Sequence, residues 1–112
     1  MIIMLYISEN TIRLTRGDTA YLTIPITSDT NESYEMKKTD TLTLSVKRRI
    51  ADTEYCFQKV STGTNMFHIE PNDTKHLKFG SYKYDIQLQT ADGDVYTIIP
   101  VSDFEILQEV TC

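Results

Sequence analysis

Few residues of this chain have side chains that could carry out chemistry, and they stand far apart in the sequence. Cys56 could act as a nucleophile if His68 or His76, the two histidines, lay beside it as a general base. Neither histidine stands at a recognised metal-ligand spacing from a cysteine or a carboxylate. A free cysteine in a strand is usually a small core residue, and a lone histidine usually has an ordinary surface or half-buried position. We therefore expect no catalytic residue, no metal site and no cofactor.

The acidic residues give no stronger candidate for catalysis. Asp92-Gly93-Asp94 resembles the start of a calcium-binding loop, but the rest of the twelve-residue ligand series is missing. The four glycines do not form a phosphate-binding loop. We therefore expect that the protein is not an enzyme. The other carboxylates considered fall mostly at predicted turns, where aspartate caps backbone groups: Asp40, Asp52, Glu54, Asp73 and Asp103.

The tripeptide Arg16-Gly17-Asp18 matches an integrin-type adhesion signal, but its position favours a turn. It stands between a short predicted strand that ends near Leu14 and a longer one that starts at Thr19. A hairpin-type connection at this point needs glycine for its positive φ, and aspartate can hydrogen-bond its own backbone just before the strand. We interpret the tripeptide as a turn.

Tyrosine is abundant, with seven residues, and surface tyrosines can stack on sugars or contact other proteins. Tyr82 and Tyr84 alternate so regularly with polar residues that we expect them in the core, with their hydroxyls at the sheet margin. Tyr21 is a better interface candidate because it lies on the polar face of its strand. An alternative function, a glycan-binding accessory module, predicts a cluster of exposed tyrosines on one solvent face, formed by Tyr21, Tyr34, Tyr55 or Tyr96.

Composition limits the partners. A net charge of −5 argues against nucleic acid, which needs a clustered basic face, and the run Lys47-Arg48-Arg49 is short. The apolar residues 1–5 lack the charged region and cleavage site of a signal peptide, and no stretch approaches the length of a membrane span. We expect a single domain over residues 1–112, with neither a nucleic-acid nor a membrane partner and without secretion through a signal peptide.

Alternation of apolar and polar residues dominates the chain and predicts strands. Pro25 cannot donate to a ladder, so the strand 20–27 is predicted to lie at a sheet edge or to carry a bulge. Asp92-Gly93 predicts a tight hairpin turn. The inward positions in the clearest strands are Ala20, Leu22, Ile24, Ile26, Leu42, Leu44, Val46, Phe67, Ile69, Tyr82, Tyr84, Ile86 and Leu88. Further strands are predicted at 6–7, 11–14, 54–60, 95–99 and 103–110.

Two segments lack this alternation. Residues 28–40 are polar and are predicted to form a long connection. One short helical turn is predicted near residues 72–78, after Pro71, capped by Asn72 or Asp73 and anchored in the core by Leu77. We expect an all-β, immunoglobulin-like antiparallel β-sandwich of about seven to eight strands. The cysteine–tryptophan–cysteine signature of true immunoglobulin domains is missing.

Three stretches carry a resemblance to a known family: residues 14–26 (LTRGDTAYLTIPI), 40–49 (DTLTLSVKRR) and 69–111. Its main features are the turn at residues 16–18, the block from Asp73 to Leu88 and the closing DF.I..EVT. The chain resembles a small β-sandwich domain of tailed phages and prophages of Gram-positive bacteria. It is similar to the N-terminal domain of baseplate upper proteins and to related short phage structural proteins.

The resemblance implies a non-enzymatic structural protein of the virion, an accessory subunit of the baseplate, tail or neck. Such proteins assemble through protein–protein contacts, often in symmetric rings. The implied partners are other phage structural proteins or further copies of the chain. The implied location is the virion, or the cytoplasm of the bacterial host during assembly. The candidate assembly interface combines the polar face of the strand 20–27 with the apolar N-terminus: Tyr21, Thr23, Pro25, Thr27, Ile3 and Leu5.

Overall fold

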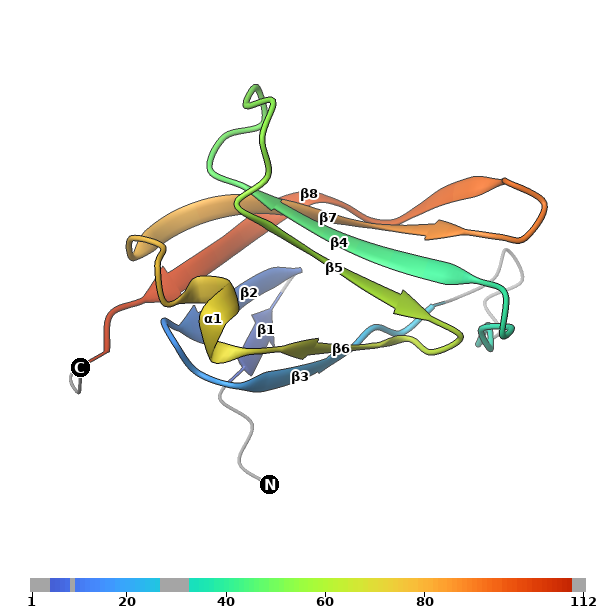
Figure 1. Ribbon diagram of the computed structural model, residues 1–112, viewed down its shortest axis with the longest axis horizontal. Coiled ribbons are helices and arrows are strands. Elements are labelled where there is room, and N and C mark those ends of the chain that lie inside the picture. Colours follow the sequence, from blue (N-terminus) through green and yellow to red (C-terminus); the bar gives the residue numbers. More distant parts are fainter. Residues whose placement is uncertain (1–4, 9, 27–32, 110–112) are drawn as a thin grey trace.

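Strands make up most of the chain in the computed structural model, which describes residues 5–8, 10–26 and 33–109 (Figure 1). The described residues form eight strands and one short helix, so the prediction of a mostly-strand chain is confirmed. In chain order the elements are β1 (Leu5–Ser8), β2 (Thr11–Thr15), β3 (Ala20–Thr23), β4 (Thr41–Lys47), β5 (Phe57–Thr62), β6 (Met66–Ile69), α1 (Pro71–Thr74), β7 (Gly80–Gln89) and β8 (Val95–Leu107).

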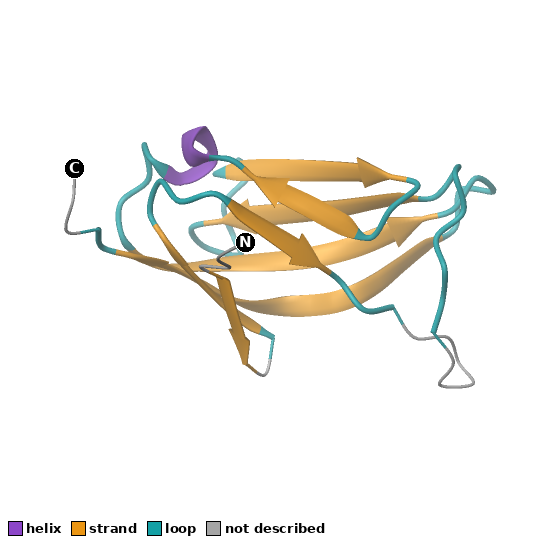
Figure 2. Cartoon of the chain, turned by 90° about the horizontal axis from the view of Figure 1, so that it is seen from below, coloured by secondary structure: helices purple, strands orange, loops and turns teal. Residues whose placement is uncertain are grey.

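The strands are divided unequally between two sheets (Figure 2). The larger sheet has six strands in the order β1-β2-β8-β7-β4-β5, and the smaller one consists of β3 and β6. Neighbouring strands pair antiparallel, except that β2 runs parallel to β8, from the Ile12–Phe104 pair to the Thr15–Leu107 pair. The sheets curl into a half-barrel, and their apolar side chains lie between them.

The core follows the alternation in the sequence. Leu42, Leu44 and Val46 of β4 are fully buried, and the polar residues between them face outward. Each such side chain removed from water contributes about 1.5–3 kcal/mol of hydrophobic stabilisation. Every predicted inward position is buried, so this part of the prediction is confirmed. Four further core residues come from β2 and β8: Ile12, Leu14, Phe104 and Ile106.

Tyr82 and Tyr84 lie in the core, and their hydroxyl groups reach its margin, as predicted. The Tyr82 hydroxyl donates to the carbonyl oxygen of Lys78 at 2.6 Å. The Tyr84 hydroxyl donates to the carbonyl oxygen of Asn10, in the turn between β1 and β2, where Asn10 has a φ of 69°. Burial raises the pKa of Tyr84 to about 12, because the phenolate would be poorly solvated there. The two tyrosines therefore join the core to two connections of the chain.

β8 is one continuous strand, so the prediction of two strands separated near Pro100 was wrong. The β7–β8 register shifts between Tyr84 and Gln87, which leaves extra residues on β8 opposite β7. Pro100 falls within this irregular stretch, and a bulge is one of the few places where a strand tolerates proline. β2 pairs with β8 only from Phe104 onward, so Pro100 interrupts no ladder on that side among the described residues.

Arg16-Gly17-Asp18 is a turn, as predicted, but it connects the two sheets and is not a hairpin. The amide of Asp18 donates to the carbonyl oxygen of Thr15 at 3.1 Å, and Gly17 has a φ of 81°. This left-handed backbone conformation favours glycine. The Gly17 amide also donates to the hydroxyl of Thr74 in α1 at 2.8 Å. The turn is therefore fixed against the helical turn that crosses between the sheets.

α1 connects β6 of the small sheet to β7 of the large sheet, as predicted, but its details differ. The N-cap is Glu70, where Asn72 or Asp73 was expected, because Asp73 accepts a hydrogen bond from the Glu70 amide at 2.7 Å in a capping box. Leu77 packs against the core while half-buried, and the fully buried residue of this segment is Thr74. The predicted connection 28–40 lies in part outside the described residues.

Replacing Thr74 with valine will destabilise the fold by about 1–2 kcal/mol. The substitution keeps the shape of the side chain but leaves the Gly17 amide without its acceptor, and an unpaired, partly buried amide is costly. Urea denaturation followed by circular dichroism measures the change. Thr74→Ser is the matched control, since it loses a methyl group and keeps the oxygen. A T74V protein as stable as T74S would contradict the role of this hydrogen bond.

Candidate functional site

The outward face of the small sheet is the best-formed candidate surface for binding. β3 and β6 pair so that Tyr21 faces His68 and Thr23 faces Met66. The rings of Tyr21 and His68 are stacked, with centroids 4.5 Å apart and an interplanar angle of 7°. Beside them Thr23 is exposed, and Met66 is 44% exposed. Aromatic and methionine side chains are enriched in protein interfaces, and threonine adds hydrogen-bonding capacity without charge. We call these four residues the β3–β6 face.

The predicted interface residues do not all belong to this face. Tyr21 and Thr23 do, and Pro25 is exposed two residues after the end of β3. Leu5 begins β1 in the other sheet, where its backbone pairs with Leu14. The predictions for Thr27 and Ile3 fall outside the described residues.

β3 ends before Pro25, although the buried alternation continues to Ile26. The Ile24 amide donates to the carbonyl oxygen of Asn65 at 2.9 Å, and the Asn65 side chain donates to the carbonyl oxygen of Ile24 at 2.7 Å. The amide of Tyr34 donates to the carbonyl oxygen of Ile26 at 2.8 Å. Side-chain and loop contacts therefore continue the strand beyond its ladder and hold Pro25 facing outward.

His68 and Met66 are the site residues that sequence reasoning did not assign to the interface. Their outward direction follows from the alternation in 66–69, but their pairing with Tyr21 and Thr23 depends on a register between strands far apart in the chain. A stacked aromatic pair across two antiparallel strands contributes about 0.2–1 kcal/mol relative to alanine. The stack holds Tyr21 in a fixed position on the β3–β6 face.

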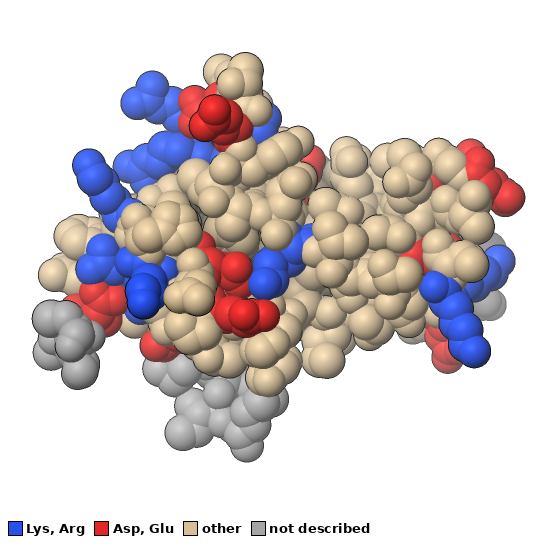
Figure 3. Space-filling view, viewed as in Figure 1, with Lys and Arg blue, Asp and Glu red and all other residues tan. Residues whose placement is uncertain are grey.

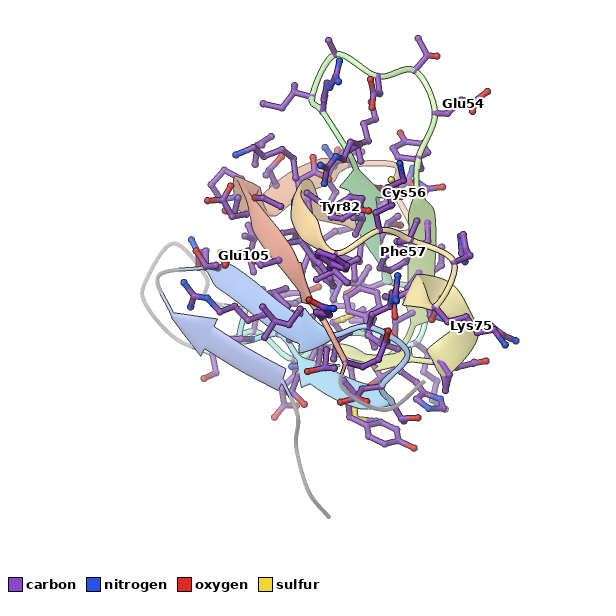
Figure 4. All side chains as sticks on the ribbon, turned by 90° about the vertical axis from the view of Figure 1, so that its left-hand side faces the viewer. Glu54, Cys56, Phe57, Lys75, Tyr82 and Glu105 are labelled. Atoms are coloured by element: carbon purple, nitrogen blue, oxygen red, sulfur yellow. The ribbon has the colours of Figure 1, made fainter. Side chains whose placement is uncertain are left out.

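Cys56 and the histidines are not brought together. Cys56 is half-buried just before β5, and its amide donates to the carbonyl oxygen of Val46 at 2.7 Å. Burial raises the pKa of the Cys56 thiol, which opposes formation of a nucleophilic thiolate. The charged groups that act on it are Asp52 and Arg48, not a histidine. Figure 4 shows Cys56 near Tyr82, below the loop that carries Glu54. The arrangement needed for a Cys–His nucleophile is not present in the described residues.

The four tyrosines proposed for glycan binding do not share a face. Tyr21 lies on the outward side of the small sheet, whereas Tyr55 borders a groove on the outward side of the large sheet. Tyr34 packs against the edge of the core and binds Asp40, and Tyr96 is exposed near the end of the β7–β8 hairpin. The four tyrosines therefore do not form one common platform, although Tyr34 and Tyr96 lie near enough to interact electrostatically.

The groove on the outward face of the large sheet has a volume of about 190 Å³. The ammonium group of Lys47 lies 5.0 Å from the centre of the Tyr55 ring, and Lys83 pairs with Asp103 at 2.5 Å. Burial raises the pKa of Asp85, which also lines the groove, and nearby Lys47 opposes the shift. The positive charges of Lys47 and Lys83 are thus offset by the carboxyl groups of Asp85 and Asp103, in and beside the groove. The other residues that line it are Ser45, Ile50, Tyr84, Gln87 and Val101.

Asp40 is a buried carboxylate at the start of β4 with a structural role. It accepts hydrogen bonds from the Tyr34 hydroxyl at 2.5 Å and from the Lys37 amide at 2.9 Å. These two bonds, the Tyr34 bond first, lower the pKa of Asp40 below its ordinary value, while burial acts in the opposite direction. Asp40 thereby fixes the end of the connection that precedes β4.

No group of three or more histidine, cysteine, aspartate or glutamate side chains within residues 5–8, 10–26 and 33–109 could hold a metal ion. In the same residues no helix has the length and apolar character needed to cross a membrane. Comparison with known proteins finds no matching family model, no matching curated protein and no matching solved structure.

Stability will fall as the pH falls below the ordinary aspartate pKa of 3.8, and Tyr34→Phe will make this fall shallower. The folded state holds the pKa of Asp40 below that value, so around it the unfolded chain binds more protons and acid favours unfolding. Without the Tyr34 hydroxyl the folded pKa returns toward the ordinary value. Thermal unfolding at a series of pH values measures the slope. Glu109, whose pKa Arg16 lowers, titrates in both proteins and cancels in the comparison. Identical acid slopes for the two proteins would refute this assignment.

Proposed function

We propose that the chain is a non-enzymatic structural protein of a phage or prophage virion, an accessory subunit of the baseplate, tail or neck. It acts through protein–protein contacts, and other virion proteins are its partners. The observation that carries the proposal is the β3–β6 face, where a stacked aromatic pair lies beside an exposed methionine and an exposed threonine. This composition matches protein interfaces better than a site for a small charged ligand.

The resemblance to phage β-sandwich domains supplies the virion context, and its most specific block has a clear structural meaning. The block from Asp73 to Leu88 contains the capping aspartate of α1 and the whole alternating half of β7. Gly80 within it has a φ of 142°, and a Cβ atom there would meet the Arg48 guanidinium at 3.0 Å. These residues therefore determine the backbone conformation at the start of β7. A resemblance in this block supports a similar fold more directly than it supports a common ligand.

We infer in addition that the two sheets form an immunoglobulin-like sandwich. The central order β8-β7-β4 and the separate β3–β6 pair correspond to strands G-F-C and B-E of that fold. Tyr82, at the start of β7, donates its hydroxyl hydrogen bond to a backbone carbonyl four residues upstream. That is the arrangement of a tyrosine corner, which marks the E–F connection in immunoglobulin-like domains. It supports the inference without the cysteine–tryptophan–cysteine signature.

The virion role is tested by inducing the prophage in the organism that encodes the chain. Particles are purified on a density gradient and analysed by mass spectrometry. The expected result is that the chain co-purifies with intact particles in a fixed ratio to known virion proteins. Recovery of the chain only in the soluble fraction, with complete particles lacking it, would refute the virion role.

Met66→Lys will reduce incorporation into particles by more than about tenfold, a loss of about 1.4 kcal/mol of binding free energy. The substitution places a charge on the β3–β6 face, where a partner would have to desolvate it. Val60→Lys is the matched control, because Val60 is 63% exposed on the outward side of the large sheet. Thermal unfolding verifies that both variants fold. Equal incorporation of the two variants would exclude the β3–β6 face as the contact.

A further inference from the structure

The two ends of the molecule differ in their charged side chains, although positive side chains also lie below the acidic tip at the right of Figure 3. Positively charged side chains gather toward the left-hand end of Figure 3, and the tip of the β7–β8 hairpin at the upper right is acidic. We call Arg48, Lys75 and Lys78, with the exposed Phe79, the basic end. We call residues 91–96, which include Asp92 and Asp94, the hairpin tip. In Figure 1 the connection between α1 and β7 lies toward the left, and the β7–β8 hairpin reaches the right-hand end of the longest axis.

The basic end is built around the connection between α1 and β7. Phe79 is 50% exposed, and the guanidinium carbon of Arg16 lies 5.8 Å from the centre of its ring. Arg16 also donates to the carbonyl oxygen of Leu77 at 3.2 Å. On the other side Arg48 donates to the carbonyl oxygen of Ser81 at 2.9 Å. Two arginines from distant parts of the chain therefore hold this connection in place.

The positive charge at this end is not neutralised within the described part of the chain. No carboxylate there lies within 4.0 Å of the charged groups of Arg48, Lys75 or Lys78. Glu109, which also reaches this end, is paired with Arg16 at 2.5 Å. Lys75 projects from the end of α1 in Figure 4. An uncompensated positive surface on a protein of net charge −5 attracts acidic surfaces, including those of its own copies.

The hairpin tip has complementary properties. Residues 91–97 are all exposed, and a Cβ atom added at Gly93 would meet nothing within 4 Å. No cation within the described residues forms an ion pair with Asp92 or Asp94. Val95 and Tyr96, just behind them, are 55% and 53% exposed. The tip thus combines two unpaired carboxylates with apolar side chains, as the basic end combines unpaired cations with Phe79.

We propose that the basic end of one copy binds the hairpin tip of a second copy. Tyr96 and Phe79 supply apolar contact area, and the lysines face the two aspartates, which gives charge complementarity and fixes the orientation. Because the two surfaces differ, the contact is head-to-tail and builds a ring or a filament. A two-fold dimer through either end would bring like charges together. The inference rests on the proposed assembly function and names a second copy as one partner.

The test is charge reversal measured by sedimentation velocity over a range of protein concentrations. Lys75→Glu with Lys78→Glu takes the net charge from −5 to −9, and Asp92→Lys with Asp94→Lys takes it from −5 to −1. Neither lysine makes a described side-chain contact, so the fold should be kept. Each double variant is expected to lose self-association by more than about tenfold. The two double variants change the net charge in opposite directions, so an effect of net charge alone would weaken association in one and strengthen it in the other. Charge complementarity between the two surfaces predicts that both variants associate more weakly.

The decisive experiment is to mix the two charge-reversed double variants and measure their association with each other. The reversed basic end of one variant matches the reversed tip of the other, so the mixture should regain association that neither variant shows alone. Association of the unmodified protein should also weaken at high salt, where the Debye length falls from about 10 Å at 0.1 M to about 3 Å at 1 M. Lys37→Glu with Lys38→Glu, which also gives −9, is the control and should keep association.

Three results would overturn the head-to-tail contact. The first is a monomer at every concentration in low salt, which would leave virion incorporation through the β3–β6 face as a separate question. The second is equal loss in the Lys37/Lys38 control, which would indicate general repulsion. The third is association that survives both charge reversals and disappears in Met66→Lys, which would place the self-contact on the β3–β6 face.

Discussion

The small sheet can exist only because the large sheet covers it. Two strands alone are marginally stable in water, and β3 and β6 are separated by more than forty residues, so their pairing also carries a loop-closure cost. Burial of Leu22 and Phe67 against the large sheet offsets this cost. At one end the two sheets are joined by the Gly17–Thr74 hydrogen bond and by the Lys59–Asp73 ion pair at 2.9 Å. The Tyr21–His68 stack depends on this closure, because the register of β3 with β6 places the two rings opposite each other.

The open edges of both sheets carry features that hinder strand addition. Pro25 follows the end of β3, and Pro100 lies in the stretch of β8 that β2 does not cover. On the edge strand β5, Lys59 points inward opposite Leu44 and reaches Asp73. Proline and inward-pointing lysine are the devices by which natural sheets avoid edge-to-edge pairing. Assembly by strand addition is therefore less favourable than assembly through the faces and ends of the molecule, where the exposed aromatic and charged residues lie.

Local patterns were sufficient for the core and insufficient for the topology. The alternation in 82–88 has a period that only a half-buried strand satisfies, so its inward residues were predictable. The bulge that allows β8 to continue through Pro100 depends on its pairing with β7, which the local sequence does not specify. Whether the turn at Arg16 joins two sheets or forms a hairpin depends on which strands pair. The outward direction of His68 was readable, but its partner was not, because cross-strand contacts follow from register. Thr74 was missed since a small polar residue gives no periodic signal of burial.

The net negative charge of the chain gave no indication that one of its surfaces is locally positive. Lys47-Arg48-Arg49 is too short to suggest a basic surface, and the strand directs its members apart: Lys47 turns to Tyr55 in the groove, and Arg48 turns to Tyr82 at the basic end. That end acquires its other cations from segments more than twenty residues away in the sequence. The arginines there are held by carbonyl oxygens and aromatic rings, so their side chains have lost much of their freedom on folding. Arg48 is therefore already ordered and loses less entropy on association, whereas Lys75 and Lys78 would be ordered only when the contact forms.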